Sequence, residues 1–127
     1  MHIFAVANQK GGVAKTATVA SLAACLSQLG QRVLAIDSDP QGNLSMAMGA
    51  QASQGMLSTY DLLLGEKVGV GDCALRVPWG KVDVVPADVR LAAAEVERRQ
   101  FERFAGRKHD VFGSLHRLLV RGRNHRR

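Results

Sequence analysis

Residues 7–18 read ANQKGGVAKTAT, a glycine-rich stretch that separates two segments of different periodicity. Before it, residues 2–7 form an apolar run with enough branched and aromatic side chains for a buried strand. After it, residues 15–29 carry aliphatic side chains at helical spacing, and Gly30 follows where a helix commonly ends. A turn of this kind aims backbone N–H groups and the positive end of a helix at one point. The stretch therefore predicts a phosphate-binding loop.

Two side chains of this loop suit a nucleotide that is bound with a metal ion. Lys15 supplies a mobile positive charge for the β- and γ-phosphates, and Thr16 supplies a hydroxyl for Mg²⁺. The strict pattern G-x-x-x-x-G-K-[ST] is not met, because Gln9 and Ala14 occupy its two glycine positions. Taken alone, the turn is also compatible with a structural turn that binds nothing.

A pair of acidic residues follows the next apolar run. Residues 32–36 (RVLAI) predict a second strand, covered on both faces, since the residues on either side are polar. Asp37 and Asp39 come directly after it, where ligands bind in open parallel sheets. On an extended segment these two side chains point the same way, so together they can hold Mg²⁺ and orient a water. Loop solvation and helix capping are the alternative roles.

The remaining sequence adds further helices and one strand. The predicted elements are helices at residues 43–48, 57–64, 89–104 and 111–120 and a strand at residues 82–85. Pro86 stops the strand, Asp88 is a candidate N-cap for the helix that follows, and residues 69–80 are weakly defined. Strands that alternate with helices predict an α/β fold with a parallel sheet and flanking helices.

Positive charge is concentrated at the end of the chain. The 127 residues are enough for one domain, which we expect at residues 1–120, with residues 121–127 as a basic tail too charged to pack. Residues 1–97 contain seven Lys and Arg against nine Asp and Glu, a net charge of −2. Residues 98–127 contain ten against two, a net charge of +8. Such a segment predicts either contact with nucleic acid or a solvated terminus.

The composition also indicates a cellular compartment. No apolar run approaches the roughly 20 residues that span a bilayer, and the first residues lack the pattern of a signal peptide. Cys25 and Cys73 lie far apart without metal-ligand spacing, which favours free thiols in a reduced, cytoplasmic setting. We expect Cys25 to be a small buried core residue.

Three motifs together resemble one family. KGGVAKT resembles the deviant Walker A motif of the ParA/MinD class of P-loop ATPases, usually KGGVGKT[TS]. DSDPQGN resembles the D-x-DPQGN of ParA-type proteins, and VVPADVRLAAAEVE is similar to a segment further along in them. The motifs occur in the same order and cover most of residues 1–105, and they are closer to the partition proteins than to MinD. The resemblance implies a P-loop NTPase-like fold.

The resemblance assigns roles to individual residues. It implies catalytic roles for Lys10, which would reach the partner's nucleotide in an ATP-sandwich dimer, and for Asp39, which would position the attacking water. It implies that Asp37 supports Mg²⁺ together with Thr16. The residues implied to bind ATP are Gly11, Gly12, Val13, Ala14, Lys15, Thr16 and Ala17.

The sequence departs from the family pattern in three places. Ala14 replaces a glycine, which we expect to be tolerated only at negative φ. Ala17 replaces a hydroxyl residue that touches phosphate in the family, and a lost hydrogen bond to a charged group costs about 1.5–3 kcal/mol. The family's next strand, its Walker B region, has no counterpart after Val120. We therefore expect a fold truncated before that strand and impaired hydrolysis of ATP.

The family's known biology supplies the functional expectation. ParA-type proteins segregate plasmid or chromosomal DNA, bind DNA as nucleotide-dependent homodimers, and are stimulated by a ParB-like partner. The alternatives are a non-catalytic remnant that acts as a partner-binding module and a MinD-like membrane-associated ATPase. The terminal RGRNHRR is no amphipathic membrane helix, so no membrane partner is expected.

Overall fold

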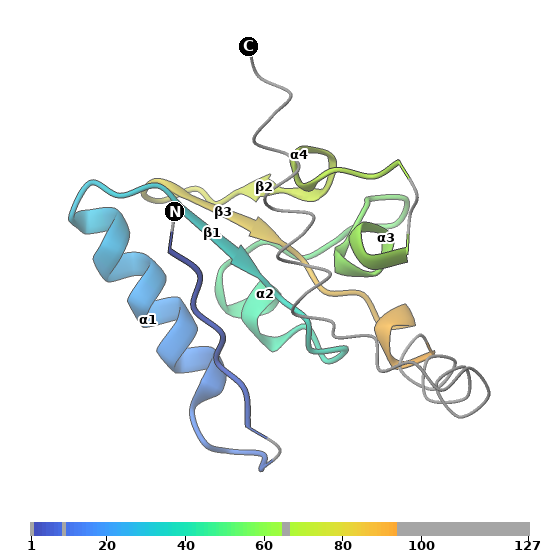
Figure 1. The fold of residues 1–127 in the computed structure, drawn as a ribbon, viewed down its shortest axis with the longest axis horizontal. Helices are drawn as coiled ribbons and strands as arrows, with labels where there is room; N and C mark the ends of the chain where they lie inside the picture. The colour runs from blue at the N-terminus through green and yellow to red at the C-terminus, as the bar shows by residue number, and fades with distance from the viewer. Residues whose placement is uncertain (1, 9, 65–66, 94–127) are drawn as a thin grey trace.

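A three-stranded sheet is the centre of the computed structural model, which describes residues 2–8, 10–64 and 67–93 (Figure 1). The strands are β1 (Val33–Ile36), β2 (Leu75–Arg76) and β3 (Val82–Val85), in the order β1-β3-β2. β1 runs parallel to β3, with Val33 opposite Val82, and β2 runs antiparallel to β3. The predicted α/β class is confirmed. The sheet is mixed rather than wholly parallel, because a short turn connects β2 directly to β3.

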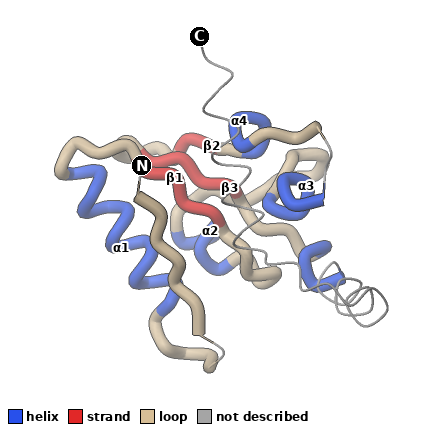
Figure 2. Tube along the Cα trace, viewed as in Figure 1, coloured by secondary structure: helices blue, strands red, loops and turns tan. Residues whose placement is uncertain are grey.

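Helices flank the sheet (Figure 2). They are α1 (Lys15–Gln28), α2 (Asn43–Ala47), α3 (Thr59–Leu64) and α4 (Val70–Cys73). α1 packs against α2 and against both parallel strands, whereas α3 packs against α4. Another helical segment begins at Arg90, as the prediction for residues 89–104 requires. Most of that predicted helix, the predicted helix at residues 111–120 and the basic tail lie outside the described residues.

The alternation of side chains along the strands builds two clusters of buried residues. Ala35, Val82 and Val84 belong to the cluster that also holds Ala23 of α1 and Leu44 of α2. The second cluster consists of Val85, Leu62 of α3 and Cys73 of α4, with Ile36 packed against it. Each face of a strand thus meets a different pair of helices, which is the expected consequence of the two-residue period of a strand.

The N-terminal segment, residues 2–8, contradicts the sequence-based prediction of a buried strand. It runs beside α1 without strand pairing (Figure 1). Ile3, Phe4 and Val6 are 50%, 70% and 41% exposed. A strand needs a neighbour for its N–H and C=O groups, and among the described residues β1 pairs with β3 alone. The apolar run therefore has the composition of a strand but no partner.

Two other expectations about burial were wrong. β1 was predicted to be covered on both faces, but Leu34 is 37% exposed because no described strand lies along that edge of the sheet. Cys25 was expected in the core, but it lies on an exposed part of α1, and Cys73 is the buried thiol. Burial raises the pKa of Cys73, and the charges of Asp61 and Asp72 raise it further.

A close contact fixes the far end of α1 against the sheet. Gly30, at φ +82°, ends the helix, and its N–H donates to the carbonyl of Ser27 at 2.9 Å. The hydroxyl of Ser27 accepts a hydrogen bond from the backbone N–H of Lys81 at 2.7 Å. A Cβ on Gly80, which has φ +68°, would collide with that hydroxyl. The turn before β3 therefore needs glycine both for its conformation and for the approach of α1.

Within the part of the chain that the structure describes, no helix is both long and apolar enough to cross a bilayer.

Candidate functional site

The predicted phosphate-binding loop connects the N-terminal segment to α1. Gly12 has φ +71°, and a Cβ built on it or on Gly11 would meet nothing within 4 Å. The space beside the loop is thus open to a ligand. The N-terminus of α1 lies on the same side of the sheet as the carboxyl ends of β1 and β3 (Figure 1). This is the edge at which open α/β sheets bind ligands.

Ala14 adopts a conformation that the sequence argument excluded. It lies immediately before α1 at φ 60° and ψ 22°, in the left-handed region, whereas a negative φ was expected. The geometry of the loop requires this conformation, and alanine adopts it at a cost of about 1–2 kcal/mol relative to its right-handed region. The alanine is therefore accommodated as a strained residue of the loop.

The first backbone N–H groups of α1 carry a positive partial charge that no acidic side chain of the first turn neutralises. Among the described residues no side chain caps this end of the helix, and the first turn contains no acidic residue. The first N–H groups of a helix have no partner within the helix and carry its positive partial charge. Thr16 is half-buried in this turn, and Ala17 is exposed and supplies only its backbone. Phosphate oxygens fit these donors better than any neutral group does.

Hydrogen bonds hold the side chain of Lys15 and the backbone of Lys10 within the loop. The Nζ atom of Lys15 donates to the backbone carbonyl of Lys10 at 3.2 Å, so the ammonium folds back over the loop. The backbone N–H of Lys10 donates to the side-chain oxygen of Asn8 at 3.0 Å. Neither lysine forms an ion pair with an acidic residue in the described ranges. Their charges are available to an anion.

The two aspartates after β1 differ in environment. Asp37 is 3% exposed, whereas Asp39 is exposed. The expectation of two carboxylates pointing the same way on an extended segment was wrong, because the chain turns there: the N–H of Asp39 donates to Oδ1 of Asp37 at 3.1 Å. Asp39 in turn accepts the N–H of Gln41 on Oδ1 at 3.0 Å. The loop presents Asp39 to solvent and keeps Asp37 inside.

Ser45 is a site residue that the sequence argument missed. Its N–H and its hydroxyl both donate to Oδ2 of Asp37, at 2.8 and 2.6 Å. The same hydroxyl oxygen accepts the N–H of Ala87 at 3.0 Å, so Ser45 links the exit of β1 to the exit of β3. A serine eight residues after an aspartate gives no recognisable signal in a sequence, since the contact depends on the turn between them.

A second polar cluster lies away from the loop. Arg90 donates to both carboxylate oxygens of Asp61, at 3.2 and 2.9 Å, and to Oδ2 of Asp88 at 2.8 Å. Its guanidinium lies 4.5 Å from the centre of the Tyr60 ring. Burial raises the pKa of Asp61, but hydrogen bonds from Arg90 and Ser58 outweigh it and hold that pKa below its usual value. The hydrogen bond from Arg90 also lowers the pKa of Asp88.

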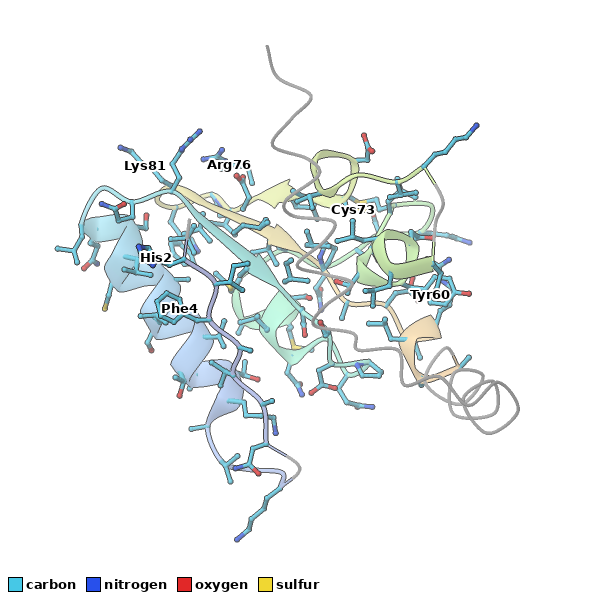
Figure 3. The ribbon with its side chains drawn as sticks, in the orientation of Figure 1. His2, Phe4, Tyr60, Cys73, Arg76 and Lys81 are labelled. Atoms are coloured by element: carbon cyan, nitrogen blue, oxygen red, sulfur yellow. The ribbon has the colours of Figure 1, made fainter. Side chains whose placement is uncertain are left out.

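This cluster borders an open hollow of about 400 Å³ that is lined mainly by the loop at residues 52–57. The hollow contains none of the motif residues, and Arg90 is already paired with two carboxylates. The cluster joins the segment after β3 to α3, on which Figure 3 shows Tyr60. Its contacts explain how the fold is held together and do not form part of the candidate site.

Two side-chain oxygen donors of the predicted site are of the kind that a magnesium ion bound with a nucleotide would use. Among the described residues, no group of three or more His, Cys, Asp or Glu side chains could hold a metal by itself. Mg²⁺ commonly takes only one or two protein oxygens and completes its shell with phosphate oxygens and waters. The hydroxyl of Thr16 and the carboxylate of Asp37 are oxygen donors of this kind.

Comparison with protein families and curated proteins gives consistent matches. The AAA_31 family model, described as an AAA domain, matches residues 1–113. The chain is 41% identical over 115 residues to the chromosome partitioning protein ParA of Caulobacter vibrioides. It is 42% identical over 95 residues to the sporulation initiation inhibitor protein Soj of Bacillus subtilis. These matches cover 91% and 75% of the chain but only 43% and 37% of the relatives.

Solved structures of related proteins also match this chain over part of their length. Cobyrinic acid a,c-diamide synthase from Mycobacterium smegmatis, with bound ADP and magnesium, is 37% identical and superposes with a TM-score of 0.74, covering 91% of this chain and 43% of the other. A Cyanothece McdA variant in complex with ATP is 28% identical, with a TM-score of 0.66, over 74% of this chain and 35% of the other. The chain thus spans less than half the length of the proteins it matches.

Proposed function

This chain belongs to the AAA-domain family of ParA-type P-loop ATPases, and from that premise we propose that residues 10–17 bind Mg·ATP. The observation that carries the proposal is the N-terminus of α1. There Ala14, in the left-handed conformation, leads into a helix whose first turn has no acidic residue and no side-chain cap from the described part of the chain. Similar chains with bound ADP or ATP, such as the M. smegmatis synthase and the Cyanothece protein, support it.

Each residue of the motif has a role in this proposal. The N–H groups of the loop and of the first turn of α1 cradle the phosphates, and Lys15 neutralises the charge of the β- and γ-phosphates. Thr16 and Asp37 supply oxygens toward Mg²⁺, which polarises and orients the phosphates when it is bound. Asp39, which is exposed, would hold the attacking water, and Lys10 would reach a partner's nucleotide.

The biological role that we propose is DNA segregation. The two relatives named ParA and Soj support it, the first being called a chromosome partitioning protein. In this role the nucleotide controls formation of a homodimer, a ParB-like protein stimulates hydrolysis, and the basic residues of 98–127 bind DNA without sequence preference. Charge alone supplies such binding, because it neutralises phosphates without reading bases.

The direct test is the loss of nucleotide binding on removal of the Lys15 charge. Lys15→Ala should weaken binding of Mg·ATP in calorimetry at least roughly tenfold, because a hydrogen bond to a charged group contributes about 1.5–3 kcal/mol. Lys81→Ala is the matched control: Lys81 lies at the opposite end of the sheet and points outward (Figure 3). Unchanged affinity in Lys15→Ala would refute the assignment of the loop.

A further inference from the structure

Asp37 is a buried carboxylate with one free acceptor position. An ionised carboxylate has about four such positions. Oδ2 accepts two hydrogen bonds from Ser45, and Oδ1 accepts one from the N–H of Asp39. No Lys, Arg or His forms an ion pair with Asp37 in the described part of the chain. A buried charge without a counter-ion is costly, so the remaining position on Oδ1 suits a cation or a water bound to one.

The hydroxyl of Ser45 has a single possible orientation. Its oxygen accepts the N–H of Ala87, so its one hydrogen is left to donate to Oδ2 of Asp37. Ser45 is 2% exposed, and water has no access to replace either bond. The chain of bonds from Ala87 through Ser45 to Asp37 is therefore directional, and each bond polarises the next. It fixes the carboxylate and determines which oxygen remains available.

We propose that Ser45 is a positioning residue that orients Asp37 toward the Mg²⁺ of a bound nucleotide. This inference rests on the proposed function, since it assumes that the loop binds a nucleotide with Mg²⁺. Partners that orient a metal ligand from behind typically change metal affinity by about 10–100-fold when they are removed. Ser45 is therefore assigned to the ion and not to the phosphates, which the loop and Lys15 contact.

A purely structural role has to be separated from this one. Asp37 also supplies the acceptor for a backbone N–H in the first turn of α2, whose own N-cap residue, Gly42, has no side chain to do so. Ser27 offers a matched control. It is also a buried serine whose hydroxyl accepts a backbone N–H, that of Lys81, but it lies at the opposite end of the sheet. Ser27→Ala removes the same atom and leaves a similar unpaired donor.

The experiment measures the affinity for ADP by calorimetry, with Mg²⁺ and with EDTA, in the whole chain. The ratio of the two dissociation constants is the magnesium effect. Ser45→Ala should reduce this ratio about tenfold while leaving the affinity in EDTA near that of the wild type. Ser27→Ala should leave both unchanged even where it lowers the melting temperature. Ser45→Thr, which keeps the hydroxyl, should retain the magnesium effect, and Ser45→Cys, of similar bulk, should lose it.

Each outcome bears on one of the two proposals. An unchanged magnesium effect in Ser45→Ala, or equal effects in Ser45→Thr and Ser45→Cys if the alanine variant does not fold, would overturn the role of Ser45. A wild-type chain that binds ADP equally well with and without Mg²⁺ would overturn it too, while leaving the loop assignment intact. A wild-type chain that binds no ADP would refute the proposed function itself, and the positioning role with it.

Discussion

Ala14 has a backbone conformation that is strained for a residue with a side chain. Its φ of 60° lies in a region that glycine adopts freely and alanine does not. Ala14→Gly should therefore raise the free energy of unfolding by about 0.5–1 kcal/mol, since relief of strain exceeds the added entropy of the unfolded chain. Urea denaturation would measure the change.

The same substitution inside α1 provides the contrast for Ala14. Ala24→Gly, in the middle of the helix, should lower stability by about 0.5–1 kcal/mol because glycine costs entropy there. If Ala14→Gly is as destabilising as Ala24→Gly, the left-handed conformation before α1 is wrong.

The chemistry of single residues was readable from the sequence where it depended on local spacing. Lys15 and Thr16 lie three and four residues after Gly12, where the glycine-rich turn gives way to helical spacing, so their place at the start of a helix needed no knowledge of the fold. The conformation of Ala14 was not readable, because a residue in a loop takes the φ that the loop imposes. The burial of Asp37 and its bond to Ser45 also escaped prediction, since both depend on how the turn at residues 38–42 folds back.

At the scale of elements, the contact of α1 with the turn before β3 leaves no room for a side chain on Gly80. Gly80→Ala adds a side-chain carbon that collides with the hydroxyl of Ser27 and also strains a φ of +68°. We expect a loss of about 2–4 kcal/mol, from overpacking and from backbone strain together. Thermal unfolding followed by circular dichroism would measure it.

Gly55→Ala separates strain from collision in that measurement. Gly55 has φ +86° and open space around it, so an alanine there is strained but meets no neighbour. Its loss should be smaller, about 1 kcal/mol. Equal losses at Gly55 and Gly80 would show that Ser27 does not approach the turn as closely as described.

The Arg90 cluster makes the link between α3 and the segment after β3 dependent on pH. Asp61 and Asp88 have pKa values below the usual 3.8, because Arg90 stabilises their charged forms. Carboxylates of this kind contribute stability above the unfolded pKa and lose it as the pH falls through the folded pKa. Arg90→Gln should therefore destabilise the fold at pH 7, and the difference from the wild type should shrink as the pH falls below 3.8 and vanish once the pH lies below the lowered pKa values of Asp61 and Asp88.

Denaturation curves between neutral and acidic pH would test this prediction. Arg76→Gln breaks the Arg76–Asp83 pair, whose side chains are 61% and 36% exposed. Because water screens so exposed a pair, its effect at neutral pH should be smaller than that of Arg90→Gln. A difference between Arg90→Gln and the wild type that persists unchanged in acid would contradict an ionic origin.

The elements that the sequence predicted correctly are those with an internal signal. α1 shows a helical period and ends at Gly30, and β3 ends before Pro86. α4 and β2 were not predicted, because four and two residues are too few to show a period, and β2 exists only through its pairing with β3. The prediction of a strand at residues 2–7 was wrong because a strand also needs a pairing partner. The segment has the composition of a strand, but no described strand lies beside it.

For the whole molecule, the free edge of β1 has the largest consequence. Among the described residues β1 pairs with β3 alone, so its other side offers backbone N–H and C=O groups beside exposed apolar residues, with Leu34 on the strand itself. Edges of this kind are templates for pairing with another chain. We expect the purified chain to self-associate as its concentration rises, as seen in size-exclusion chromatography with light scattering.

A charge on that edge should suppress the association. Leu34→Lys places a lysine on β1, where strand pairing would bury it, and should shift the chain toward the monomer. Leu29→Lys is the control, because Leu29 is 74% exposed but lies at the end of α1 and outside the sheet. A wild-type chain that stays monomeric at all concentrations, or equal effects of the two lysines, would show that the edge is not the cause.

The two cysteines differ in exposure, which allows one thiol to be labelled selectively. A maleimide dye reacts with a thiolate that it can reach, and burial together with a raised pKa protects Cys73 from it. Cys25 is exposed on α1, the helix whose first turn belongs to the proposed phosphate-binding loop. The unmodified sequence can therefore carry one fluorophore at a known position, and changes in its emission on addition of nucleotide would report directly on that helix.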